Sequence, residues 1–252
     1  MSHRSRASLI HLLISLFLVS AILSLVILIW YPRPYFDAMG ISGILLMLAA
    51  VDVTIGPLIT FIIFKPNKPS LKFDLTVIAL LQCAALAYGC STVLTGRPVY
   101  VVYNVDRFTV VTQGDIPPAE LARAGNPAMP LNGPQVVGAR LPQDPEELKR
   151  ILFSSIGGGA DLAQMPAYYL PYKDIASEVT RKILSLDLLF ARQSTDVASA
   201  REAVASALTQ AGLTQAEVGF LPLRAKTSDL SVLVRRTDAA IIAILPVDPW
   251  GI

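Results

Sequence analysis

Long apolar runs fill most of the first 96 residues of this chain, and short alternating patterns follow them. Residues 7–31 contain no Asp, Glu, Lys or Arg, and the 22 residues between Asp74 and Arg97 carry no formal charge. A further run, about residues 41–64, holds a single carboxylate, Asp52. Each run has roughly the ~20 residues that a helix needs to cross a bilayer core. The pattern predicts three transmembrane helices, at about residues 8–30, 41–64 and 73–94, within a membrane region of residues 1–96.

The first run is longer than the apolar segment of a signal peptide. Such a segment has roughly 7–15 residues and is followed by small residues at a cleavage site. The run from residue 7 to residue 31 continues to Trp30 and Tyr31 and then meets two prolines. We therefore expect a first helix that is not cleaved. Trp30, Tyr31 and Tyr35 are expected at a membrane–water interface, where aromatic residues with a polar tip are enriched.

Basic residues in the short connections predict the orientation. Arg4 and Arg6 precede the first run, and the turn at residues 65–72 holds three lysines, whereas the loop at residues 31–39 has one arginine and one aspartate. Cytoplasmic loops carry an excess of Lys and Arg. The N-terminus and the 65–72 turn are thus expected in the cytoplasm. With three spans, residues 97–252 are expected in the periplasm of a bacterium, anchored to the inner membrane.

Residues 97–252 have the pattern of a mixed α+β domain. Val99–Asn104 and Phe108–Gln113 predict a β-hairpin, and Asp144 followed by Pro145 predicts a capped helix start. The last predicted strand is nearly all apolar, which favours a central place in the sheet. The further predicted elements are strands at 136–141, 219–224, 230–235 and 239–247, and helices near 115–125, 173–191 and 195–211, the last one starting at Ser194 or Thr195.

Composition and charge agree with this division. The chain is 53% hydrophobic and 16% charged, whereas soluble domains carry roughly 25% charged residues. Residues 1–96 hold six basic and three acidic residues, and residues 97–252 hold fifteen and sixteen. No basic run or RNA-binding motif indicates a nucleic-acid partner. Both histidines lie in the first eleven residues, and no nucleophile elbow, P-loop or zinc-protease motif is present. We expect neither enzymatic activity nor a cofactor or metal.

Asp52 is the residue in the membrane region that most strongly suggests a function. A carboxylate in mid-bilayer costs about 2.5–3.5 kcal/mol on insertion scales and usually faces a partner or water. It lies roughly 18 Å from the Lys65 end of its helix. Asp52 could clamp the three helices together, receive a transmembrane helix of another protein, or couple to protons or ions. Gly56-Pro57 follows one turn later, and a kink is expected there because proline cannot donate to the helix ladder.

Three segments resemble a known family. VDVTIGPLITFIIF (51–64), KPSLKFDLTVIALLQ (68–82) and RPVYVVYNVDRF (97–108) are similar to the type IV pilin accessory proteins of the TfpX/TfpZ family, to which the fimbrial accessory protein FimB belongs. The resemblance covers about residues 5–115, and beyond it only the general layout matches. It implies no catalytic residues. The matching positions that are candidates for partner binding or helix–helix contact are Asp52, Gly56, Pro57, Lys72, Asp74, Asn104, Asp106 and Arg107.

The resemblance implies a non-enzymatic inner-membrane protein that assists type IV pilin or pilus biogenesis. Its expected partners are the major pilin, the pilus assembly machinery and membrane lipids. A pilin waits in the membrane on one hydrophobic helix, so membrane helices and a periplasmic domain together could bind both its parts, and avidity would result. Two alternatives stay open: a membrane-anchored enzyme that modifies pilin or an envelope polymer, and a membrane-anchored envelope-binding or sensor module.

Overall fold

The computed structural model describes residues 2–193 and 196–251. The chain folds as two compact units. The first comprises Met1–Pro32 and Gly40–Gly96, and the second comprises Arg33–Met39 and Arg97–Ile252. The second unit is therefore discontinuous in sequence, since it includes a seven-residue segment between the first two apolar helices.

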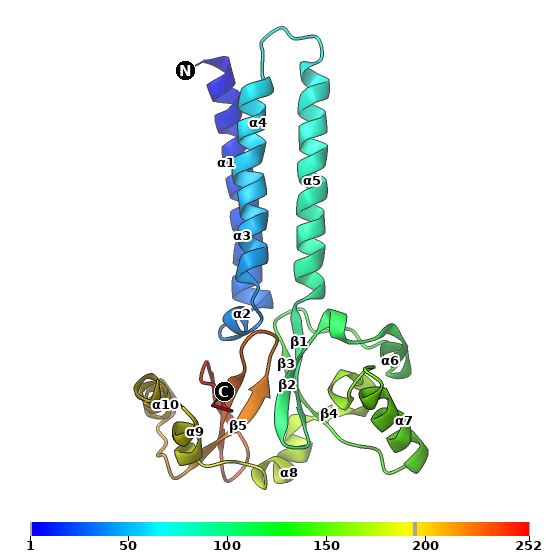
Figure 1. Ribbon diagram of the computed structural model, residues 1–252, viewed down its shortest axis with the longest axis vertical. Helices are drawn as coiled ribbons and strands as arrows, with labels where there is room; N and C mark the ends of the chain where they lie inside the picture. The colour runs from blue at the N-terminus through cyan, green and yellow to red at the C-terminus, as the bar shows by residue number, and fades with distance from the viewer. Residues whose placement is uncertain (1, 194–195, 252) are drawn as a thin grey trace. The chain divides into compact units, whose positions relative to one another are not determined.

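The first unit consists of three helices that are long and apolar enough to cross a membrane (Figure 1). All three apolar runs are thus helical as predicted, and the first helix begins five residues earlier than expected. Two of the helices change to π-helical geometry along their length. The elements are α1 (His3–Leu25) with η1 (Val26–Trp30), then α3 (Ser42–Ala50), η2 (Val51–Ile55) and α4 (Gly56–Ile63), and finally α5 (Leu71–Thr95).

The three helices are not equally buried by one another. α1 packs along α4 and η2, while α5 touches the other helices over a smaller part of its surface. In the most apolar 18-residue stretch of α5, 6% of the residues are buried, against 28% in the second helix. A surface this apolar is unfavourable in water and matches a lipid environment. α5 is therefore the most exposed of the three.

The second unit is built on one seven-stranded mixed sheet. The strand order is β4-β3-β1-β2-β5-β6-β7. β1 pairs with β3 in parallel, β2 pairs with β5 in parallel, and the other neighbours are antiparallel. This confirms a mixed sheet-and-helix domain. The strands are β1 (Pro98–Asn104), β2 (Arg107–Thr112), β3 (Gln135–Ala139), β4 (Tyr169–Pro171), β5 (Val218–Arg224), β6 (Leu230–Arg235) and β7 (Ile241–Leu245).

Helices cover the two halves of this sheet and enclose two cores. One core lies between β1, β2 and β3 and the helices α6 and α7, with Val99, Val102 and Met165 at its centre. The other lies between β5, β6 and β7 and the helices α9 and α10, with Leu189 and Phe220 fully buried. The helices are α6 (Pro118–Arg123), α7 (Pro145–Ile156), α8 (Ala176–Thr180), α9 (Leu186–Arg192) and α10 (Val197–Ala211), with short 3-10 turns at η3 (Gln113–Asp115), η4 (Leu162–Gln164), η5 (Pro166–Tyr168) and η6 (Tyr172–Ile175).

The helix ends follow from their capping residues. The Asp144 side chain accepts the N–H of Glu147 at the start of α7 (3.1 Å), as predicted. Gly212 ends α10 in the left-handed conformation (φ 66°). The predicted start of that helix, at Ser194 or Thr195, lies outside the described residues. Asp196 caps α10 through the N–H of Ser199.

The single helix predicted over residues 173–191 is wrong. The segment forms η6 and α8, then an extended stretch, then α9. Leu184 interrupts it, because its backbone N–H and C=O both bond to Phe220 of β5 (3.0 Å each). Ser185 then caps a new helix by accepting the N–H of Leu188. Helical periodicity of apolar residues concealed a strand contact that depends on a residue far along the chain.

The central position predicted for the last strand is also wrong. β7 lies at the edge of the sheet and pairs with β6 alone. Its uninterrupted apolar sequence arises because both of its faces are half-buried, and α10 packs against it. Burial on both faces therefore does not require a neighbour on both edges.

The segment between the first two apolar helices is part of the second unit. It contains α2 (Tyr35–Ala38). The carbonyl of Ala38 accepts the N–H groups of Thr227 and Ser228, at 2.9 and 3.3 Å. Tyr35 is 7% exposed, and burial raises its pKa to about 12. The Tyr31 ring is also buried and donates to the carbonyl of Val93 (2.9 Å). Both rings are enclosed by protein, and their place at a lipid–water interface stays a prediction.

Candidate functional site

Asp52 lies in an irregular turn of the second apolar helix. It belongs to η2, where the helix widens to π-helical geometry. Pro57 follows in the first turn of α4 and has no N–H to donate to the ladder. A π-helical turn is one way in which a helix accommodates such an interruption. The irregularity at Gly56-Pro57 is thus a widened turn, and a kink angle there stays a prediction.

The Asp52 side chain is enclosed by all three apolar helices. Asp52 is 5% exposed. The Gln82 amide on α5 donates to the Asp52 backbone carbonyl (Nε2–O 3.4 Å) and also bonds to its carboxylate. A cavity of about 150 Å³ adjoins these groups and is large enough for water molecules. Its polar lining consists of His11, Ser15, Asp52, Gln82 and Cys83.

Two further polar contacts join α1 to α4. The His11 Nδ1 and Thr60 Oγ1 atoms are 2.6 Å apart, and the Ser8 hydroxyl donates to the carbonyl of Pro57 (2.9 Å). Ser8, His11 and Ser15 share one face of α1, because they are three and four residues apart. That spacing is the signal in the sequence that could have identified this face. Thr60 and Gln82 carry no comparable signal, because their partners lie on other helices.

Two glycines lie against side chains of the neighbouring helix where α5 meets the second apolar helix. A Cβ atom on Gly56 would lie 1.9 Å from Nε2 of Gln82, and one on Gly89 would lie 2.7 Å from Cδ1 of Leu48. At both positions an added Cβ would require the end of the neighbouring side chain to move. Small residues let transmembrane helices approach closely. Gly56 therefore leaves the space that the Gln82 amide occupies beside Asp52.

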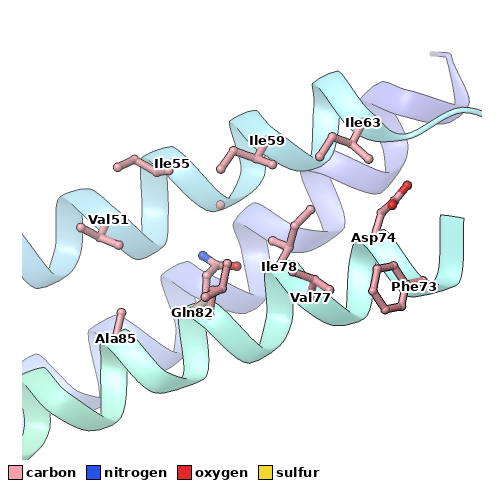
Figure 2. Close-up of a pocket in the computed structure, with 12 residues that line it drawn as sticks. Val51, Ile55, Ile59, Ile63, Phe73, Asp74, Val77, Ile78, Gln82 and Ala85 are labelled. Atoms are coloured by element: carbon pink, nitrogen blue, oxygen red, sulfur yellow. The ribbon is translucent and has the colours of Figure 1, made fainter. Parts of the chain in front are cut away.

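An apolar groove runs between α4 and α5 beside this contact (Figure 2). Its volume is about 520 Å³. Asp74 lies at its Phe73 end and pairs with Lys68 (Nζ–Oδ2 2.5 Å), while Lys72 is exposed. Apart from Asp74 and Gln82 the groove offers only apolar surface. Its lining residues are Val51, Ile55, Gly56, Ile59, Ile63, Phe73, Asp74, Val77, Ile78, Leu81, Gln82 and Ala85.

The NVDRF motif forms the turn between β1 and β2 in the second unit. Val105 has a positive φ of 59°. The Arg107 guanidinium binds both oxygens of Asp106 (2.8 and 3.1 Å) and holds the pKa of that carboxyl below its usual range. The same guanidinium lies 5.0 Å from the ring centre of Trp250, whose indole N–H donates to Asp229 (2.7 Å). The motif thus attaches the C-terminal segment to the hairpin.

The eight predicted site residues fall into two sets. Five belong to the first unit and three to the second. Of the first set, only Asp52, Gly56 and Pro57 lie together; Asp74 is at the far end of the groove. In the second set, Asp106 and Arg107 bind each other, and Asn104 Oδ1 is buried with no hydrogen-bond partner among the described residues. A role of these residues in partner binding stays a prediction.

The chemistry available around Asp52 is hydrogen bonding. Across residues 2–193 and 196–251, no group of three His, Cys, Asp or Glu side chains is placed to hold a metal ion. The buried polar groups are one carboxylate, one imidazole, one amide and several hydroxyls, drawn from three helices. Such contacts contribute up to about 1–2 kcal/mol each between transmembrane helices. The arrangement suits the joining of helices, the first of the three roles considered for Asp52.

Comparisons with known proteins agree on one family. The family model of the fimbrial assembly protein FimB matches residues 1–40. Two fimbrial assembly proteins of Dichelobacter nodosus, of serogroups I and E1, are 31% and 30% identical over 245 residues, which is 96% of this chain and 94% of each relative. The protein of serogroups C1 and C2 is 35% identical over 117 residues, 46% of this chain and 89% of that relative.

None of the solved structures matches this chain. The curated relatives extend the similarity well past residue 115, where the sequence motifs end. Their names describe assembly of fimbriae rather than catalysis. By identity over nearly its whole length, the chain belongs to the FimB family of fimbrial assembly proteins.

Proposed function

We propose that this protein is a non-enzymatic accessory of fimbrial biogenesis that spans the bacterial inner membrane three times and binds the type IV fimbrial subunit. The observation that carries the proposal is the open apolar groove between α4 and α5, next to a cluster of polar groups that are already bonded within the protein. The cluster holds the helices together, and the groove offers a site for a further helix.

The packing of residues 33–39 supports the three-span topology. These residues connect the first and second apolar helices, and they fold with residues 97–252. Both segments must therefore lie on the same side of the membrane. Two spans, one on each side of the 65–72 turn, separate residues 33–39 from residues 97–252 and meet this requirement. The positive-inside rule then favours the periplasm for the domain, because the 65–72 turn is basic.

Reporter fusions test this topology. Alkaline phosphatase, which is active only outside the cytoplasm, is fused to the full chain at its C-terminus or inserted after Asn67 in the 65–72 turn. We expect activity from the C-terminal fusion and none from the insertion. The reverse result would place the domain in the cytoplasm and reject the proposal.

The groove suits a single hydrophobic helix. It extends from Val51 to Ile63, which corresponds to roughly 18 Å of helix length, more than half of a bilayer core of about 30 Å. Transmembrane helices associate by close packing and hydrogen bonds, since lipid is as apolar as their side chains. Ala85, a small residue in the lining of the groove, leaves room for a close approach. A fimbrial subunit anchored by one helix provides such a partner.

The second unit would bind the soluble head of the same subunit. Two weak contacts on tethered partners act together, because the first binding event raises the effective concentration for the second. Asn104, Asp106 and Arg107 are the proposed contact residues there, since the hairpin turn leaves Val105 and Asp106 exposed. The lipid bilayer and the fimbrial assembly machinery are the further proposed partners.

Photo-crosslinking tests the groove directly. A photoreactive amino acid is placed at Leu81, which lines the groove, and in a matched variant at Leu80, which does not. The two side chains are 67% and 64% exposed, so they are equally accessible. We expect a crosslink to the fimbrial subunit from Leu81 and a much weaker one from Leu80. Equal crosslinking from both, or none from Leu81, would reject the groove as the binding site.

A further inference from the structure

One edge of the sheet is open and apolar. β7 ends the strand order and pairs with β6 on one side. Among the described residues, no backbone hydrogen bond joins its other side to another segment. A strand that pairs on one side only directs alternate N–H and C=O groups outward. All five of its side chains are partly exposed, and no residue from Ala239 to Val247 is charged.

The opposite edge of the sheet is protected. β4 has only three residues, and its last one is Pro171, which cannot donate a hydrogen bond. Proteins commonly shield edge strands with proline, charge, short length or a covering segment. β7 is longer than β4 and has neither proline nor charge within it, although Pro246 follows its last residue. The two edges therefore differ in their capacity to accept another strand.

We propose that β7 is the surface through which two copies of this protein pair, so that their sheets join across a two-fold axis. The strand reads Ile-Ile-Ala-Ile-Leu, with a small residue at its centre and aliphatic residues on both sides. Two copies that overlap fully about Ala243 place aliphatic side chains next to aliphatic ones, with no charge between them. The strand is thus complementary to itself, as a two-fold contact requires.

The protected edge makes this assembly closed. Pairing uses the β7 edge of both copies and leaves only the two β4 edges, which Pro171 blocks. The sheet cannot extend further, so the product is a pair and not a fibre. Within the pair, Ala243 of one copy lies beside Ala243 of the other, at the roughly 4.5–5.5 Å that separates neighbouring residues on paired strands. This inference does not depend on fimbrial-subunit binding.

Cysteine crosslinking in membranes tests the pairing. Ala243→Cys is made in the full chain with Cys83→Ser and Cys90→Ser, which remove both native thiols. The matched control is Val105→Cys at the β1–β2 turn, which is exposed but far from β7 in the sheet. Paired Cα atoms about 5.5 Å apart permit a disulfide. Mild oxidation is expected to give a species of twice the chain mass from Ala243→Cys and little from Val105→Cys.

Three outcomes would overturn the proposal. Equal dimer from both variants would indicate random collision in the membrane. A species that combines this chain with the fimbrial subunit would assign the edge to a different partner. Monomer alone from Ala243→Cys would show that the edge stays unpaired. Circular dichroism of both purified variants verifies that neither substitution unfolds the protein, so each of these results bears on the pairing itself.

Discussion

The two units of this protein bury polar groups in different ways. In the apolar helices, Asp52, His11 and Thr60 bond to amides, hydroxyls and backbone carbonyls of neighbouring helices. In the sheet domain, Arg150 lies between Glu120 and Glu147, at 2.7 and 3.1 Å, and also binds the Tyr168 hydroxyl. These contacts keep the pKa of the Arg150 guanidinium above its usual value.

The difference follows from what else holds each unit together. The sheet domain has two apolar cores, so its ion pairs add to a fold that burial already stabilises. Helices in lipid gain little from burying apolar surface, since lipid is equally apolar. Polar contacts, and glycines that leave space for a neighbouring side chain, then have a larger share in how the helices pack. Substitutions should therefore destabilise the domain where charge is buried, and should change helix contacts where small or polar residues meet.

The largest effect is expected from Arg150→Met. It leaves Glu120, which is 8% exposed, without its hydrogen-bonded cation, and only the more distant Arg123 guanidinium, at 4.0 Å, remains. Loss of one partner of a buried pair costs about 3 kcal/mol or more. Thermal unfolding of the full chain in detergent measures it, with Lys149→Met as the control, because Lys149 forms an exposed pair worth less than about 1 kcal/mol. If both variants lowered the unfolding temperature equally, the contacts of Arg150 would contribute no more to stability than an exposed ion pair.

An intermediate effect is expected from Gly56→Ala in the helices. The added Cβ would lie 1.9 Å from Nε2 of Gln82, so the Gln82 amide must move and leave the Asp52 carbonyl without its donor, at a cost of about 1–3 kcal/mol. Gly43→Ala is the matched control, because no atom lies within 4 Å of its Cβ position. Both variants are compared by thermal unfolding in detergent. If Gly43→Ala lowered the unfolding temperature more than Gly56→Ala, the close contact between Gly56 and Gln82 would not be important for stability.

A smaller effect should separate hydrogen bonding from charge at Asp52. Asp52→Asn keeps a side-chain oxygen for Gln82, whereas Asp52→Leu keeps only the backbone carbonyl. We expect Asn to leave the surface fimbria count close to that of the natural protein, and Leu to reduce it, since one such bond contributes about 1 kcal/mol. A low count with Asn would favour a role for the negative charge. An undiminished count with Leu would show that the Asp52 contact is dispensable.

The smallest effect concerns Asp106 and Arg107. The guanidinium lowers the pKa of the Asp106 carboxyl, so its contribution is present above the unfolded pKa of about 3.9 and is lost as the pH falls through the lower folded value. The pair is partly exposed, so it contributes about 0.5 kcal/mol or less. Trp250 fluorescence in a Trp30→Phe background should stay constant from pH 8 to 5. A transition near pH 6 would contradict this assignment.

The sequence was most informative where structure depends on neighbours along the chain. The three apolar helices follow from length and composition, and Asp144 and Gly212 act locally as caps. The order of the strands was not accessible, because β2 pairs with β5 across more than a hundred residues of sequence. The break at Leu184 has the same origin, since it depends on pairing with Phe220 of β5. The edge position of β7 depends on the order of the whole sheet.

The candidate site divides in the same way. Asp52 could be identified from its isolation in an apolar run, and Gly56-Pro57 from its effect on a helix. The hydrogen bond between Gln82 and Asp52 could not be predicted from the sequence, because it depends on how α5 packs against the second apolar helix. Thr60 is one of many hydroxyl residues in apolar helices, and only its distance of 2.6 Å from His11 distinguishes it.

The carbonyl of Ala38 has a consequence for biosynthesis. It satisfies two N–H groups of the turn at Thr227 and Ser228, so a fragment that begins at Arg97 has two donors without their acceptor. The domain is therefore complete only when residues 33–39, which lie between the first two apolar helices in the sequence, have joined it. Folding of the sheet domain is thereby coupled to the placement of the segment that joins two apolar helices. A soluble version for biochemical work needs this heptapeptide joined to it.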